Sequence, residues 1–157
     1  MTKAKQTRVF ILLASGLEET DVSTVTRILR QEGVSVVLVG LTAGPIRGNY
    51  GLALMPDASL GAIDGEIPYA VIVPGGTRGV RRLAADPRVH VLLRRVFEQG
   101  GYIVVLGAAS AILETLGVEN QAQAVSDGFD AADVPDGQVF IAECAEAAGQ
   151  LVRLLVL

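Results

Sequence analysis

The residue types that most often carry catalysis are scarce in this chain. It has one cysteine, Cys144, and one histidine, His90, among 157 residues. One of each cannot complete a zinc site, which takes three or four such ligands, so no metal centre and no disulfide are expected. Cys144 follows the last predicted strand and starts the last predicted helix, whose N-terminus would favour a thiolate. The flanking Glu143 and Glu146 oppose that charge, so the sequence favours a buried, unreactive thiol.

The positions of any reactive groups depend on the strands that precede them. Five apolar runs are rich in β-branched residues and nearly continuous, as in strands that are buried on both faces of a parallel sheet. They cover residues 8–13, 34–39, 70–73, 102–106 and 138–141.

Helical patterns alternate with these runs, at residues 19–32, 87–98, 108–116 and 143–157. Such alternation predicts a single α/β domain over residues 1–157: a doubly wound, flavodoxin-like, three-layer sandwich with a mainly parallel sheet. Residues 42–56, rich in glycine and proline, predict a small β excursion at the sheet edge. Ligands of such folds bind beyond the carboxyl ends of the strands, which selects the loops at residues 14–18, 74–79 and 107–110.

Composition limits the remaining possibilities. Hydrophobic residues make up 50% of the chain and charged residues 19%, with a mean hydropathy of +0.46. These values exclude a disordered chain, yet no uncharged apolar run reaches the roughly 18–20 residues of a membrane helix. The net charge of −4 argues against nucleic acid as the main partner. No secretion signal is recognised and only one cysteine is present, so a cytoplasmic protein without nucleic-acid or membrane partners is expected.

Charge is unevenly distributed along the chain. Residues 1–95 hold 12 basic and 8 acidic side chains, whereas residues 96–157 hold Arg153 against nine acids. We expect Arg78 to lie near the pocket, where it could hold an anion, and the other arginines of its stretch to form a solvated face that pairs with the acidic half. This basic stretch comprises Arg78, Arg81, Arg82, Arg88, Arg94 and Arg95.

Three blocks of sequence resemble the ThiJ/PfpI superfamily, a branch of the class I glutamine amidotransferase-like fold whose best-known member is the parkinsonism-associated deglycase. The first block is ILLASGLEETD at residues 11–21, which is similar to the family's opening strand and Gly-x-Glu-Glu turn. The second is PDASL at 56–60 with PYAVIVPGG at 68–76, and the third is GYIVVLGAASAIL at 101–113. Order and spacing match over residues 8–117, and the likeness fades thereafter.

This resemblance implies a chemistry that the chain departs from. Family members use a cysteine at a sharp strand-to-helix turn, a carboxylate from the first loop and often a histidine, with Pro-Gly-Gly backbone N–H groups available to an oxyanion. Here Gly107 aligns with the cysteine and Asp21 with the carboxylate, and no histidine occurs near residues 124–126. The resulting pocket candidates are Glu18, Asp21, Gly75, Gly76, Arg78, Gly107, Ala108 and Ser110.

Some of these polar residues also have a structural interpretation, which we favour. Asp21, and less specifically Glu18 and Glu19, can stabilise the start of a helix. Ser110 has no candidate base, so its hydroxyl is expected to bond a backbone carbonyl. Neither interpretation requires catalysis.

The sequence therefore favours a non-catalytic ThiJ/PfpI-like protein, without a cofactor, that acts by small-molecule binding or assembly. The alternative is a hydrolase or glyoxalase/deglycase-like enzyme that uses a non-cysteine group in the same pocket. A third hypothesis is a structural dimer partner of an active relative. The resemblance implies a homodimer, which the apolar end at residues 154–157 also favours.

Overall fold

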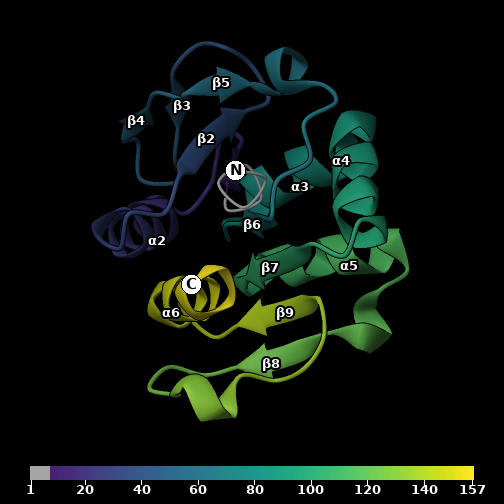
Figure 1. Cartoon of the computed structure of the whole chain (residues 1–157). Coiled ribbons are helices and arrows are strands. Elements are labelled where there is room, and N and C mark those ends of the chain that lie inside the picture. The colour runs from purple at the N-terminus through teal and green to yellow at the C-terminus, as the bar shows by residue number, and fades with distance from the viewer. Residues whose placement is uncertain (1–7) are drawn as a thin grey trace.

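The computed structural model describes residues 8–157, which form a seven-stranded sheet between two layers of helices (Figure 1). The strand order is β5-β2-β1-β6-β7-β9-β8, and every neighbouring pair is parallel. The strands are β1 (Val9–Leu13), β2 (Val36–Gly40), β5 (Ala58–Ser59), β6 (Ala70–Val73), β7 (Tyr102–Leu106), β8 (Gln123–Val125) and β9 (Val139–Ala142). The predicted doubly wound α/β fold is confirmed, and β7 lies inside the sheet, between β6 and β9.

The helices divide between the two faces of the sheet. They are α2 (Glu19–Gln31), α3 (Thr77–Ala85), α4 (Pro87–Glu98), α5 (Ala111–Leu116) and α6 (Ala145–Val156). Short 3-10 turns are η1 (Leu60–Ile63), η2 (Gly107–Ser110), η3 (Glu119–Gln121) and η4 (Ala131–Asp133). Helices α2 and α6 cover one face, while α3, α4 and α5 cover the other (Figure 1).

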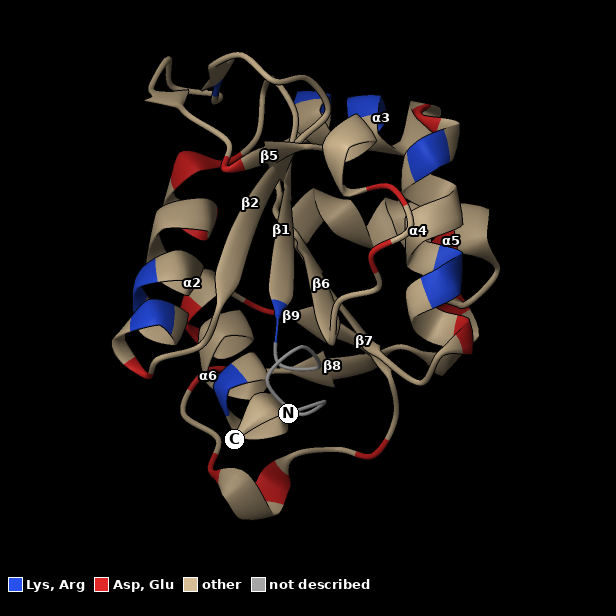
Figure 2. Ribbon diagram, turned by 45° about the horizontal axis from the view of Figure 1, so that its top comes forward, with Lys and Arg blue, Asp and Glu red and all other residues tan. Residues whose placement is uncertain are grey.

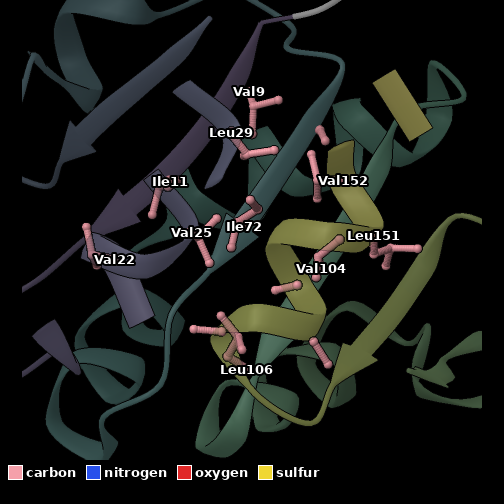
Figure 3. Close-up of a cluster of buried hydrophobic side chains, with 14 of the residues drawn as sticks. Val9, Ile11, Val22, Val25, Leu29, Ile72, Val104, Leu106, Leu151 and Val152 are labelled. Atoms are coloured by element: carbon pink, nitrogen blue, oxygen red, sulfur yellow. The ribbon is translucent and has the colours of Figure 1, made fainter. Parts of the chain in front are cut away.

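The core follows from the apolar runs. All residues of β1 and β6 are buried, so each strand feeds alternate side chains into the two cores. Figure 3 shows the core between the sheet and the α2/α6 pair, where Val25 and Leu29 of α2 and Leu151 and Val152 of α6 belong to one buried cluster. A Cβ on Gly149 would lie 2.8 Å from Ile28 Cδ1, so glycine allows α2 and α6 to pack closely.

Helix α3 and the short strands β5 and β8 were not predicted from the sequence. Helix α3 has few apolar positions, Val80 and Leu83 being its buried large residues, so its arginine-rich sequence carries only a weak helical pattern. Strands β5 and β8 are two and three residues long, which is too short for a periodic signal. Residues 42–56 contain β3 (Ile46–Arg47) and β4 (Ala53–Leu54), an antiparallel hairpin that forms its own two-stranded sheet rather than an edge of the main one.

The expected pairing of the basic stretch with the acidic half is wrong. Within residues 8–157 the ion pairs join Arg8 to Glu66, Arg30 to Asp57, Arg88 to Asp86 and Arg153 to Glu32. Among these ion pairs, Arg88 is the one arginine of the basic stretch, and it pairs with Asp86 in its own segment. Helices α3 and α4 lie far from the acidic connection between β8 and β9 (Figure 2), which explains why the two charge groups do not meet.

The apolar C-terminus is mostly part of the core. Val156 is buried and Leu155 packs against the α2/α6 cluster, so Leu157 is the exposed large side chain of this end. No helix within residues 8–157 has the length and apolar character needed to cross a membrane.

Candidate functional site

The carboxyl ends of four central strands define the candidate site. Strands β1, β6, β7 and β9 are adjacent and parallel, so the loops that follow them meet at one edge of the sheet. In the register, Leu106 at the end of β7 lies opposite Ala142 at the end of β9. This edge therefore brings together the predicted loops at residues 14–18, 74–79 and 107–110.

Gly107 forms the turn between β7 and η2. Its φ of 52° lies in the left-handed region, which glycine adopts without strain. The residue is exposed, and a Cβ built on it would find no atom within 4 Å. The turn thus has the strand-to-helix geometry expected from the sequence, and it leaves open space where a side chain would project.

Asp21 reaches from the first turn of α2 to the loop after β6. Its Oδ2 accepts a hydrogen bond of 2.9 Å from the Gly75 N–H. Burial raises the pKa of Asp21 above its usual range; the Gly75 N–H opposes this, and the negative charges of Glu18 and Glu146 add to it. Asp21 is therefore more than a helix-dipole residue, since it joins two loops of the site.

The Pro-Gly-Gly loop is held tightly against the loop after β1. The Glu18 N–H donates to the Gly75 carbonyl at 2.9 Å, and Gly76 has a φ of 97°. A Cβ on Gly76 would lie 2.4 Å from the Gly16 carbonyl oxygen, so only glycine fits. Because the Gly75 N–H is bonded to Asp21, one of the two N–H groups expected to be available to an oxyanion is occupied.

The remaining pocket candidates are close in the fold but make few contacts of their own. Glu18 is half-buried and accepts a 3.3 Å hydrogen bond from the Thr20 hydroxyl, while Arg78 is exposed in the first turn of α3. Ala108 is exposed. The Ser110 hydroxyl is half-buried and makes no hydrogen bond to the described residues, so its expected bond to a carbonyl is not found.

Cys144 lies at the same edge of the sheet, two residues beyond the Ala142 partner of Leu106. It is half-buried at the N-cap position of α6. Burial raises the pKa of its thiol, and the charges of Asp127 and Glu146 add to this, while nearby backbone N–H groups oppose it. The thiol is thus held in its neutral, weakly nucleophilic form, as its acidic neighbours predict.

Glu19 is a positioning residue that the sequence reading missed. Its side chain is only 4% exposed and packs beneath the β3–β4 hairpin. Oε2 accepts hydrogen bonds from the N–H groups of Tyr50 at 2.8 Å and Leu52 at 3.1 Å. A Cβ on Gly48 would lie 2.1 Å from the Glu19 carboxyl carbon, so the hairpin closes directly over this carboxylate. The one sequence feature that relates to Glu19 is Gly48, whose lack of a side chain makes room for the Glu19 carboxylate. Gly48 lies 29 positions away, so no local pattern connects it to Glu19.

Replacing Glu19 with glutamine is expected to weaken the attachment of the hairpin at neutral pH. Burial alone would raise the pKa of Glu19, but backbone N–H groups of α2 and the hairpin outweigh it and lower the pKa below 4.5. A carboxyl group whose pKa is lower in the native state than in the unfolded state stabilises the fold at pH values above its unfolded-state pKa. That stabilisation is lost as the pH falls through its native-state pKa.

Thermal unfolding of both proteins between about pH 7 and pH 3 measures this effect. We expect Glu19→Gln to unfold at a lower temperature than the native protein at neutral pH. The difference between the two melting temperatures should become smaller as the pH approaches about 3. A gap that stays constant over the whole range would contradict a charged, amide-bound Glu19.

The described residues at this edge include neither a histidine nor a group of side chains that could bind a metal ion. Within residues 8–157, no three His, Cys, Asp or Glu side chains are grouped so that they could hold a metal ion. The His90 ring lies in α4 and bonds the Ala84 carbonyl of α3, so it fastens two helices together.

The profile of the DJ-1/PfpI family matches residues 7–141, beyond the limit at residue 117 seen from the motifs. The chain is 30% identical over 109 residues to protein dj-1beta of Drosophila melanogaster, and the match covers 69% of this chain and 58% of that protein. It is 32% identical over 131 residues to catalase HPII of Pseudomonas aeruginosa, covering 83% of this chain but only 18% of the catalase.

Solved structures agree with the fold. A DJ-1 superfamily protein from Salmonella typhimurium superposes with a TM-score of 0.80 at 25% identity, and the match covers 95% of this chain and 90% of that one. Two relatives carry names of activities: a glutathione-independent glyoxalase of Caenorhabditis elegans, 26% identical over 73% of this chain and 61% of that protein, and a deglycase of Thermococcus kodakarensis, 24% identical over 71% and 66%.

Proposed function

Because the chain belongs to the DJ-1/PfpI family, we propose that it is a non-catalytic member which binds a small molecule at the carboxyl edge of its sheet or serves in assembly. Gly107 carries this proposal. It stands at the turn where the family's nucleophilic cysteine is expected, and it supplies no reactive atom. The open space beside it can receive part of a ligand instead.

Two further observations support a role without thiol chemistry. The Gly75 N–H is already bonded to Asp21, so one donor of an oxyanion site is occupied. The matched segment also forms only 18% of catalase HPII, so a segment of this kind can be part of a much larger protein. A domain that binds or assembles suits both observations.

A ligand bound beside Gly107 should remain with the protein through mild purification and appear in its native mass spectrum. Gly107→Leu fills the open space and should release the ligand, whereas Gly107→Ala imposes the same backbone strain and leaves most of the space free. Equal ligand content in both variants would remove the binding role from this pocket.

The second candidate is a glyoxalase/deglycase-like or hydrolytic enzyme that uses a group other than the missing cysteine. The names of the two relatives favour it, as does the position of Cys144 at the same edge as Gly107. The raised pKa of Cys144 opposes it, since the thiolate is the nucleophile. Ser110 has no base among its described contacts, so it is the weaker nucleophile of the two.

We also propose that the protein is a homodimer. The β3–β4 hairpin supports this more than the C-terminus does, because Tyr50, Leu52 and Met55 are 77%, 63% and 62% exposed. Three large apolar side chains within six residues are costly in water and typical of an interface. A structural dimer with an active relative would use the same surface.

Leu52→Lys is expected to shift a dimer to monomers at micromolar concentration, because a charge would then face the apolar contact. The Leu52 N–H still bonds Glu19 in this variant, so the hairpin should keep its place. Light scattering of both proteins measures the change, with Arg27→Glu, an exposed substitution on α2, as the control. A monomeric native protein would reject the dimer.

A further inference from the structure

Helices α3 and α4 present a basic surface, here called the α3–α4 face. Arg82 and Arg88 line one shallow groove, and Arg88 and Arg95 line the next, which has a volume of about 220 Å³ and a partly apolar wall. Val91, on the same side of α4, is 49% exposed. Arg88 is paired with Asp86, whereas Arg82 and Arg95 make no ion pair with the described residues.

The connection between β8 and β9 is the acidic counterpart of this face. Within residues 127–136, here called the acidic segment, four aspartates are exposed: Asp127, Asp130, Asp133 and Asp136. No lysine or arginine occurs between residues 96 and 152. None of the four forms an ion pair with any described residue, although Asp130 and Asp133 cap η4.

The fold keeps these two surfaces apart. Strand β8 is the edge strand of the sheet, and the acidic segment projects from that edge, away from α3 and α4 (Figures 1 and 2). The charge complementarity of the chain is therefore not satisfied within one molecule. It can be satisfied between two molecules, when the acidic segment of one meets the α3–α4 face of the next.

We propose that a second copy of this chain docks head-to-tail, with its acidic segment on the α3–α4 face. The contact joins different surfaces of the two copies, so it extends into a ring or a chain of molecules. A polyanion such as nucleic acid fits less well, because the net charge of −4 and the acidic segment would repel it. The contact involves neither the strand-to-helix turn at Gly107 nor the β3–β4 hairpin, so it is independent of the function and the dimer proposed above.

Charge substitutions on each side test this contact. Arg82→Glu with Arg95→Glu replaces two positive charges of the basic face by negative ones, and Ala132→Lys with Asp136→Lys reduces the charge of the acidic segment from −4 to −1. All four side chains are exposed and make no hydrogen bond to the described residues, so both double variants should fold, which circular dichroism verifies. Arg27→Glu, a reversal on α2, is the matched control.

Sedimentation velocity is measured over a range of protein concentrations at about 0.05 M and about 0.5 M NaCl, where screening differs strongly. At low salt, the native protein should self-associate beyond the hairpin dimer. At high salt, the same association should be weaker by at least about tenfold, because the charges are screened. Each double variant alone should lose this step, the control should keep it, and an equimolar mixture of the two variants should regain it.

Three outcomes would overturn the proposal: no association at low salt, association unchanged by either double variant, or a mixture that fails to regain it. Binding of a DNA duplex that depends on Arg82 and Arg95, without self-association, would assign the face to nucleic acid instead.

Discussion

Gly76→Ala is expected to destabilise the protein by about 3–5 kcal/mol, a large fraction of the roughly 5–15 kcal/mol by which a typical domain is stable. Two causes add. Alanine is strained at the φ of 97° that Gly76 adopts. Its methyl group would also lie 2.4 Å from the Gly16 carbonyl oxygen and 2.8 Å from the Glu18 nitrogen, and both are backbone atoms that cannot swing away.

Gly65→Ala is the matched control for this experiment. Gly65 has a φ of 86°, close to that of Gly76, but a methyl group there would meet nothing within 4 Å. Its cost should be the backbone strain alone, about 1–2 kcal/mol. Urea denaturation of both variants gives the difference, and equal losses would show that the two loops are not packed as described.

Gly107→Cys is expected to give the chain an oxidisable thiol. The open space beside residue 107 accepts the side chain, and the backbone strain at a φ of 52° costs about 1 kcal/mol. The introduced thiol would be exposed at the start of η2, close to the loop that Asp21 bonds. Peptide mass spectrometry after mild peroxide should show residue 107 oxidised at least about tenfold faster than Cys144, whose pKa is raised.

The control for this gain is Gly107→Ser, which has similar size and strain but no sulfur. Circular dichroism of both variants verifies the fold. If the introduced thiol oxidises no faster than Cys144, the turn at residue 107 does not activate a side chain. The turn then resembles the cysteine-bearing turn of the family in the shape of its backbone alone.

Continuous apolar strands made the fold predictable, because β1, β6 and β7 are buried on both faces and each is followed by a loop of distinctive sequence. Helix α3 was not predicted because it contains only two large buried residues, Val80 and Leu83, among its arginines. Two apolar positions are too few to form a clear helical pattern. The small β excursion at residues 42–56 was predicted, but its separate two-stranded sheet was not, because a run of glycine and proline indicates turns without indicating the partner strand.

The site was predictable where one loop carries the information. Gly107 and Asp21 were identified from motifs, and the structure brings their loops together through Gly75. Glu19 could not be identified, because its partners come from a hairpin about 30 residues away. The position of Cys144 at the same edge of the sheet as Gly107 also required the strand order, since β9 pairs with β7 although β8 lies between them in sequence.

Lactate formation from methylglyoxal by the unmodified protein tests the central claim most directly. A protein without a nucleophile at residue 107 should form no more lactate than buffer alone, while an active glyoxalase of the family forms it in the same assay. Lactate that rises in proportion to the protein concentration, and that disappears in Cys144→Ser or Ser110→Ala, would contradict the claim and identify the group that replaces the missing cysteine.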